Sequence, residues 1–226
     1  ANHIPFAVHS PQANKTFFCY GGTVKGKHEL LHMVSYYDHA TGMVPRPTIL
    51  LNKATSDAHD NPVLSLDDEG YVWIFSSSHG TARPSYISRS SLPYSVDEFE
   101  HVLTTNFSYP QPWYLPGRGF LFIHTRYQGG RCNFQATSRD GREWSEGKLL
   151  AKIDEGHYQV SCRWQGKVGT AFMYHPKGLG LNYRTNLYYM ETGDLGKTWK
   201  SADGRDLMLP LTHIENCARV YTYRSE

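Results

Sequence analysis

The stretch that decides the fold is Thr192-Gly193-Asp194-Leu195-Gly196-Lys197-Thr198-Trp199. It combines an aspartate that can accept backbone hydrogen bonds, a glycine that tolerates positive φ, and a large apolar tryptophan. A counterpart one residue shorter, Ser138-Arg139-Asp140-Gly141-Arg142-Glu143-Trp144, lies upstream. Two copies of one turn predict a repeated structural unit, in which both aspartates are structural rather than catalytic.

Working outward from these turns, similar segments recur about every fifty residues. Each unit alternates strand-forming stretches with turns, which predicts four strands per unit and little helix. The units lie at residues 2–52, 59–105, 107–153 and 157–212, followed by a partial unit at 213–226. This pattern predicts an all-β fold in one domain, a β-propeller of four-stranded antiparallel blades, with about four and a half blades present.

The composition narrows the range of partners. The chain has 226 residues, a formal net charge of +2 and no run of basic residues, so nucleic acid is not expected as a partner. No apolar stretch is long enough to span a membrane. Because a propeller must close on itself, we expect the remaining blades on another segment of the same protein.

Polar residues recur where the first strand of a blade begins and its second strand ends. In the second unit the turn Asp67-Asp68-Glu69-Gly70 centres a hairpin on Glu69, which places a histidine at each open end. Equivalent positions in the next two units are also polar. The three predicted pairs are His59 with His79, Tyr109 with Arg126, and His157 with His175. Their recurrence at equivalent sites predicts one shared polar pocket, flanked by Tyr127 and Tyr174.

Three of these residues also have a simpler structural interpretation. His59 could cap its own turn, Arg126 could form an ordinary ion pair, and Tyr109 could be a packing aromatic. Histidines can also bind a metal, so a structural zinc held by His157 and His175 with a cysteine is an alternative. The two cysteines considered for it are Cys132 and Cys162. Otherwise the four widely spaced cysteines, which include no CxxC pair, predict free buried thiols.

The residue types in the predicted pocket favour β-elimination from a uronic acid. No obvious carboxylate pair stands at the pocket positions, which disfavours ordinary glycoside hydrolysis; Asp60 and Glu215 are the two carboxylates left as exceptions. Arg126 would neutralise the uronate carboxylate and so acidify the neighbouring C5 proton. Either His59 or Tyr109 would remove that proton, and the other would protonate the departing O4. This chemistry requires no cofactor.

Several segments resemble the ulvan lyases of polysaccharide lyase families 24 and 25, family 25 most closely. The matching segments are residues 59–62, 73–80, 106–109, 125–127 and 156–161. The two aspartate turns resemble the Asp-box, or BNR repeat, of sialidase-like propellers. The resemblance implies a secreted bacterial enzyme with a seven-bladed propeller. It would cleave the bond between rhamnose-3-sulfate and glucuronate or iduronate in ulvan, an acidic sulfated polysaccharide, leaving an unsaturated uronate end.

The resemblance also implies roles for individual residues. His59, His79, Tyr109 and Arg126 match the catalytic positions of the family, and Tyr174 matches a substrate contact. We expect His157 and His175 to contact substrate as well. Two other functions remain open. A related propeller group cleaves rhamnose from glucuronate by hydrolysis or elimination, and a glycan-binding propeller would bind without reacting. A secreted, periplasmic or cell-surface location is expected.

Overall fold

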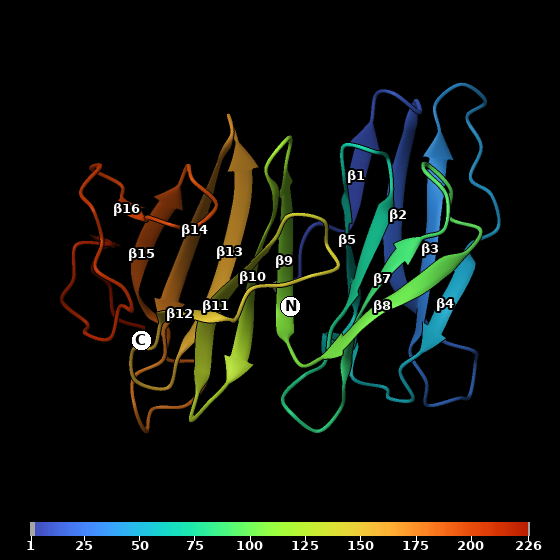
Figure 1. Cartoon of the computed structure of the whole chain (residues 1–226). Coiled ribbons are helices and arrows are strands. Elements are labelled where there is room, and N and C mark those ends of the chain that lie inside the picture. The colour runs from blue at the N-terminus through green and yellow to red at the C-terminus, as the bar shows by residue number, and fades with distance from the viewer. Residues whose placement is uncertain (1–2, 226) are drawn as a thin grey trace. The chain divides into compact units, whose positions relative to one another are not determined.

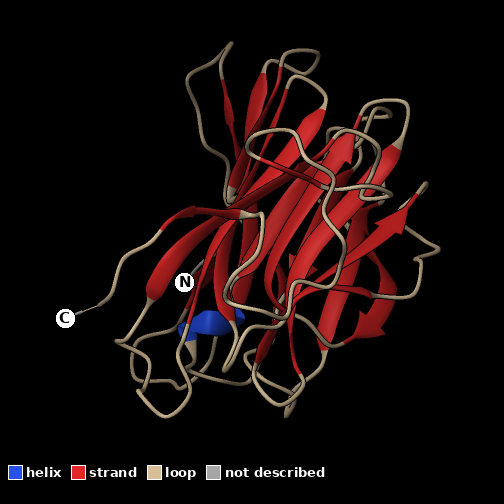
Figure 2. Cartoon of the chain, turned by 90° about the vertical axis from the view of Figure 1, so that its left-hand side faces the viewer, coloured by secondary structure: helices blue, strands red, loops and turns tan. Residues whose placement is uncertain are grey.

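The computed structural model describes residues 3–225 and contains two compact units, residues 3–117 and the residues from 118 onward. Nearly all regular structure consists of strands, and the helical turn in Figure 2 is η1, Ala58–Asp60. The predicted all-β class is therefore confirmed. Within the described part of the chain, no helix has the length and hydropathy needed to cross a bilayer.

The first unit contains two four-stranded antiparallel sheets whose strands follow one another in chain order (Figure 1). The first sheet comprises β1 (Ala7–Ser10), β2 (Lys15–Gly22), β3 (Leu31–Asp38) and β4 (Thr48–Asn52). The second comprises β5 (Pro62–Leu66), β6 (Val72–Ser76), β7 (Ser85–Ser90) and β8 (Phe99–Thr105). The unit also includes β9 (Ser108–Leu115), the first strand of the predicted third blade, which packs beside β5.

An apolar core fills the space between these two sheets. Fully buried Phe17 and Val34 come from the first sheet, and fully buried Leu64 and Ile74 come from the second. In each strand these residues alternate with residues on the opposite face, as the two-residue period of a strand requires. The core holds the β5–β6 hairpin in a fixed place, and this hairpin carries the histidine pair.

The β5–β6 hairpin has the predicted register. Pro62 pairs with Ser76 and Leu66 with Val72, so residues beyond the strand ends continue toward each other. Asp67 holds the turn through its Oδ1 atom, which accepts the backbone N–H of Tyr71 at 2.8 Å. Gly70 has a φ of +88° and packs against the Tyr94 ring, so no other residue fits without strain.

The second unit contains the remaining strands. One set comprises β10 (Gly119–Tyr127), β11 (Arg131–Ser138) and β12 (Lys148–Ala151). The other comprises β13 (His157–Trp164), β14 (Lys167–Tyr174), β15 (Thr185–Thr192), β16 (Lys200–Ser201) and β17 (Arg219–Tyr221). Residues 213–226 were predicted to begin a fifth blade. In the described part of this segment β17 pairs with β15, at the edge of the sheet that begins with β13. The division of the chain into blades stays a prediction.

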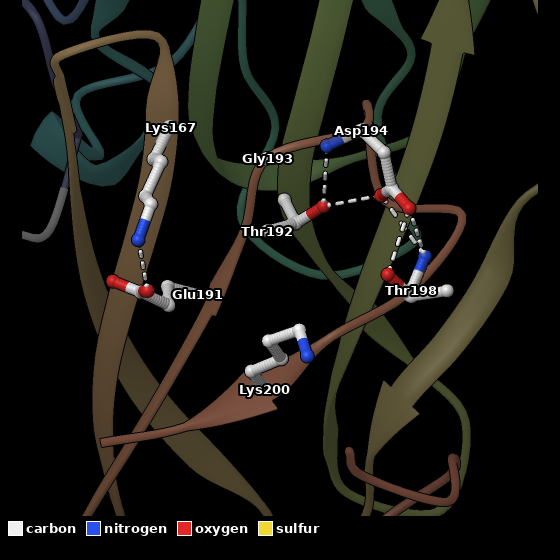
Figure 3. Close-up of a pocket in the computed structure, with 7 residues that line it drawn as sticks. All are labelled: Lys167, Glu191, Thr192, Gly193, Asp194, Thr198 and Lys200. Atoms are coloured by element: carbon white, nitrogen blue, oxygen red, sulfur yellow. Dashed lines mark hydrogen bonds and ion pairs between the residues drawn. The ribbon is translucent and has the colours of Figure 1, made fainter. Parts of the chain in front are cut away.

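The two aspartate turns have the predicted structural role. Both carboxylate oxygens of Asp194 accept hydrogen bonds inside the turn, from the Thr192 hydroxyl and from the backbone and hydroxyl of Thr198 (Figure 3). Trp199 is buried and its Nε1 donates to Gln135 on β11 at 2.9 Å. The turn therefore ties β16 to the neighbouring sheet. Asp140 accepts in the same way from the backbone of Arg142 and Glu143.

The register of the β13–β14 hairpin corrects one prediction. His157 pairs with Tyr174, not with His175, because the turn consists of two residues, Gln165 and Gly166. Both have positive φ, +48° and +75°, as a type I′ hairpin turn requires. The hairpin is therefore centred between two residues rather than on Gly166, and the predicted register was one residue out.

Candidate functional site

The predicted histidine pair forms in the first unit. His59 belongs to η1, directly before β5, and His79 follows the end of β6. Their rings stack with centroids 4.4 Å apart and an interplanar angle of 23°. The His59 side chain is 46% exposed and that of His79 35%, so both rings are open to a ligand.

Tyr109 completes this cluster from β9. Its ring centroid lies 6.2 Å from that of His59 and 6.1 Å from that of His79, and it meets both rings edge-on. Tyr109 is buried and has a φ of +50°, a region that aromatic residues rarely adopt. Such backbone strain collects at functional sites, where the surrounding structure must hold it in place.

Asp57 is the residue that sequence reasoning missed. Its Oδ1 lies 2.6 Å from Nδ1 of His59, and its Oδ2 lies 2.9 Å from Nδ1 of His79. A carboxylate only accepts hydrogen bonds, so both Nδ1 atoms donate and each neutral imidazole carries its lone pair on Nε2. One carboxylate thus fixes the orientation and tautomer of two histidines.

Asp57 is also fixed in position and charge. It caps η1, since its Oδ1 accepts the backbone N–H of His59 at 2.9 Å. Burial alone would raise its pKa, but the hydrogen bonds from His59 and His79 lower the pKa well below its usual value. The group therefore remains a carboxylate at neutral pH and a steady acceptor for both imidazoles.

A second carboxylate, which is fully buried, holds the backbone of the cluster in place. Asp60 accepts the backbone N–H of His79 at 2.7 Å and binds Arg83 through Nε at 2.8 Å and Nη2 at 3.0 Å. Burial would raise the pKa of Asp60, but these hydrogen bonds and the nearby Lys53 lower it. His79 is therefore held at its backbone by Asp60 and at its ring by Asp57.

The structure also locates the groups that could bind a metal. Among residues 3–225, three potential ligands gather at one place, Asp57, His59 and His79, with ligand atoms within 4.8 Å of one another. Hydrogen bonds already join these three side chains. The predicted zinc ligands are not gathered in this way, and the two ring nitrogens of His157 bond to Met173 O and Ile153 N. The four cysteines are free as predicted, but only Cys19 and Cys132 are buried.

The other predicted site residues lie in the second unit. Arg126, on β10, is half-buried with its guanidinium 5.2 Å from the Phe134 ring centroid. Its Nε is buried without a hydrogen-bond partner among the described residues. A Cβ on Gly147 would come 2.9 Å from the guanidinium carbon, so this glycine leaves room for the side chain. The role of Arg126 beside the histidine pair stays a prediction.

Three further predicted residues have contrasting surroundings. His157 is fully buried with both nitrogens bonded to the backbone, a geometry that favours a structural role. Tyr174 lines a hollow of about 290 Å³ together with Tyr183 and Arg224. His175 is fully buried and meets the Tyr158 ring edge-on at 5.2 Å. Their contact with substrate stays a prediction.

Comparison with known proteins places the fold. A family model described as a BNR repeat-containing family member matches residues 22–224. Two solved structures of an ulvan lyase from the new polysaccharide lyase family PL25 share the fold, with TM-scores of 0.81 and 0.80 at 19% identity. The second of them is bound to -[GlcA(1-4)Rha3S]-. The polysaccharide lyase Uly1 aligns with a TM-score of 0.69 at 12% identity.

These alignments cover 98% of this chain but 59% of each lyase, so the chain spans less than two thirds of their length. No curated protein matches the chain in sequence. At such low identity the likeness shows the fold. The predicted β-propeller of four-stranded blades and its resemblance to the ulvan lyases of family PL25 are confirmed at that level.

Proposed function

Because this chain belongs to the BNR repeat-containing family and has the fold of the PL25 ulvan lyase structures, we propose that it is a polysaccharide lyase. The proposed reaction is β-elimination at the linkage between rhamnose-3-sulfate and glucuronate or iduronate in ulvan. The observation that carries this proposal is the cluster in which Asp57 holds two stacked imidazoles beside the edge of Tyr109.

The cluster contains the acid and the base that an elimination needs. With its proton held on Nδ1 by Asp57, His59 offers a basic Nε2 that can take the C5 proton of the uronate. The Tyr109 hydroxyl can then protonate O4 as the C4–O4 bond breaks and the C4–C5 double bond forms. With the other uronate epimer, which presents C5–H from the opposite face, the two residues would exchange roles. His79 completes the imidazole stack.

Arg126 has a separate part in this proposal, which rests on the sequence resemblance. Its guanidinium would pair with the uronate carboxylate and stabilise the negative charge that develops when C5 loses its proton. Lysine would supply the charge without the bidentate geometry. Its Nε lacks a partner among the described residues, which leaves a donor for such an anion.

Hydrolysis is the less favoured alternative because of how the nearby carboxylates are engaged. Hydrolysis needs two carboxyl groups that can act on the glycosidic oxygen and on water. Both oxygens of Asp57 are bonded to histidines, and Asp60 is fully buried against Arg83. Neither is placed to act as that acid or base, which favours elimination.

The test is to follow ultraviolet absorbance while the protein acts on ulvan. Elimination creates a conjugated unsaturated uronate, so absorbance should rise. Hydrolysis would release reducing sugar without that rise, and a glycan-binding protein would produce neither signal. His59→Ala and Arg126→Ala should each abolish the rise while the folded state persists by circular dichroism. Near-normal rates in either variant would refute the assigned roles.

Two further expectations belong to the same proposal. An enzyme that attacks an algal polysaccharide must meet it outside the cytoplasm, so we propose that the protein is secreted, periplasmic or displayed on the cell surface. We also propose that the remaining blades of the propeller belong to the same protein, because the matched lyases are longer than this chain.

A further inference from the structure

A cluster of cationic and polar groups surrounds Tyr158 in the second unit. The guanidinium carbons of Arg131 and Arg184 each lie 5.0 Å from the Tyr158 ring centroid. The His175 ring meets the same tyrosine edge-on, with centroids 5.2 Å apart. These side chains come from β11, from β13 and from the loop between β14 and β15. They gather two permanent positive charges and an imidazole around one aromatic ring.

The cluster contains buried donors that have no partner among residues 3–225. Nε and Nη2 of Arg131 are buried and make no hydrogen bond there. His175 is fully buried, and the Gly180 backbone acts on its ring as a weak hydrogen-bond acceptor that does not satisfy either nitrogen with normal geometry. The amide of Asn133, two residues further along the same strand face as Arg131, is also buried without a partner. Buried polar groups normally find partners, so this concentration of unmet donors points to a missing ligand.

The charge balance of the cluster indicates the sign of the charge on that ligand. Neither Arg131 nor Arg184 forms an ion pair with a carboxylate in the described part of the chain. The Glu155 carboxylate acts on His175 from a position where its Oε1 accepts the backbone N–H of Gly178 at 2.9 Å. Burial and the two arginines lower the pKa of His175 to about 4. The local field therefore favours an anion.

We propose that Arg131, Arg184 and His175 form an oxoanion-binding site that holds a sulfate ester of the polysaccharide. Guanidinium groups bind tetrahedral and planar oxoanions through paired N–H donors, and Tyr158 keeps both arginines extended toward the ligand. Neutral His175 donates one further N–H. A uronate carboxylate shares this chemistry, and kinetics on desulfated ulvan separate the two sources. The identity of the ligand rests on the proposed function, but the anion site itself does not.

The direct test is calorimetric titration of the protein with inorganic sulfate and, separately, with acetate at low ionic strength. We expect saturable sulfate binding that weakens about tenfold or more in Arg131→Gln and in Arg184→Gln. Arg139→Gln is the matched control, because it removes one positive charge from an exposed turn of the same unit. Arg184 is exposed, so its substitution should leave the thermal midpoint unchanged. If both variants bind sulfate with the affinity of the wild type, the proposed anion site is wrong.

Kinetics on ulvan then identify the source of the anion. In both arginine variants KM should rise about tenfold with kcat unchanged, because the proposed site binds substrate and takes no part in the proton transfers. If the ligand is the sulfate ester, wild type and variants should have equal KM on desulfated ulvan. A difference that persists there would assign the carboxylate and overturn the sulfate assignment. Sulfate binding without any cleavage of ulvan would refute the proposed function and leave the anion site standing.

Discussion

At the residue scale, Asp57 determines what the histidine pair can do. The sequence pattern identified His59, His79 and Tyr109 because they stand at repeat-equivalent positions around a predictable hairpin. Asp57 precedes that hairpin, and its role depends on a capped 3-10 turn that brings its carboxylate under two rings. Spacing within one strand does not predict such a contact. The short motif Asp57-Ala58-His59 was the available signal.

The Asp57→Asn substitution tests whether the carboxylate of Asp57 sets the tautomers of His59 and His79. An amide has one oxygen and one NH₂ group, so it can accept from one imidazole but presents donors to the other, which favours the wrong tautomer. We expect kcat on ulvan to fall by about 10² to 10⁴ while KM and the fold are retained. Initial rates of absorbance increase would measure this. Asp206→Asn, at an exposed ion pair with Lys200, is the control and should keep normal activity.

Buried His157 predicts a pH dependence of stability. Burial lowers its pKa from 6.5 to about 4, so the unfolded chain binds a proton that the folded chain does not between these values. The stabilisation is complete above about pH 6.5 and is lost as the pH falls toward 4. We expect the free energy of unfolding, measured by urea titration, to decline across this window.

His157→Gln should make that decline shallower. The other buried histidines with lowered pKa values, such as His124, keep contributing to the remaining slope. An unchanged slope in this variant would contradict the structural assignment of His157.

At the element scale, the aspartate turns are the structural units that could be predicted best. Their residue types alone specify the hydrogen bonds that Asp194 accepts and the burial of Trp199. The hairpins were less certain, because register depends on how many residues form the turn. The β5–β6 register was predicted correctly, whereas the two-residue turn at Gln165-Gly166 shifted the β13–β14 register by one.

The C-terminal strand joins a sheet that the repeat pattern does not indicate. Residues 202–218 contain little regular structure, so the sequence does not indicate which sheet the following strand joins. β16 comprises only Lys200–Ser201, which leaves much of the β15 edge unpaired. β17 occupies that edge through its pairing with Leu187 and Tyr188. The unpaired edge of β15 accepts β17 as a partner strand. Counting repeats along the sequence does not reveal which strand edges are unpaired in space.

Asp194→Ala tests the structural role of the second aspartate turn. The substitution removes the acceptor for the Thr192 hydroxyl and for the Thr198 backbone and hydroxyl (Figure 3). We expect a loss of about 1–3 kcal/mol in the free energy of unfolding by urea titration, with catalytic rates retained at a temperature where the variant is folded. Asp203→Ala, at an exposed pair with Arg205, is the control. Equal stability of the two variants would refute the role of the turn.

At the scale of the whole molecule, fold and activity rest on different grounds. The fold follows from four-stranded units, aspartate turns and a close structural likeness to lyases that are longer than this chain. The proposed activity rests on one cluster in the first unit, where Asp57 and Tyr109 surround two stacked imidazoles. Many functions share the propeller fold, so the likeness to the lyases supports the proposed elimination only together with that cluster.

The measurement that tests this claim most directly is the mass of the oligosaccharides released from ulvan. Elimination predicts uronate-ended products that are lighter by one water molecule than the corresponding hydrolysis products. Tyr109→Phe, which removes only the hydroxyl that we propose as the proton donor or acceptor, should release almost none of them. Products of hydrolytic mass, or a Tyr109→Phe variant as fast as wild type, would contradict the account.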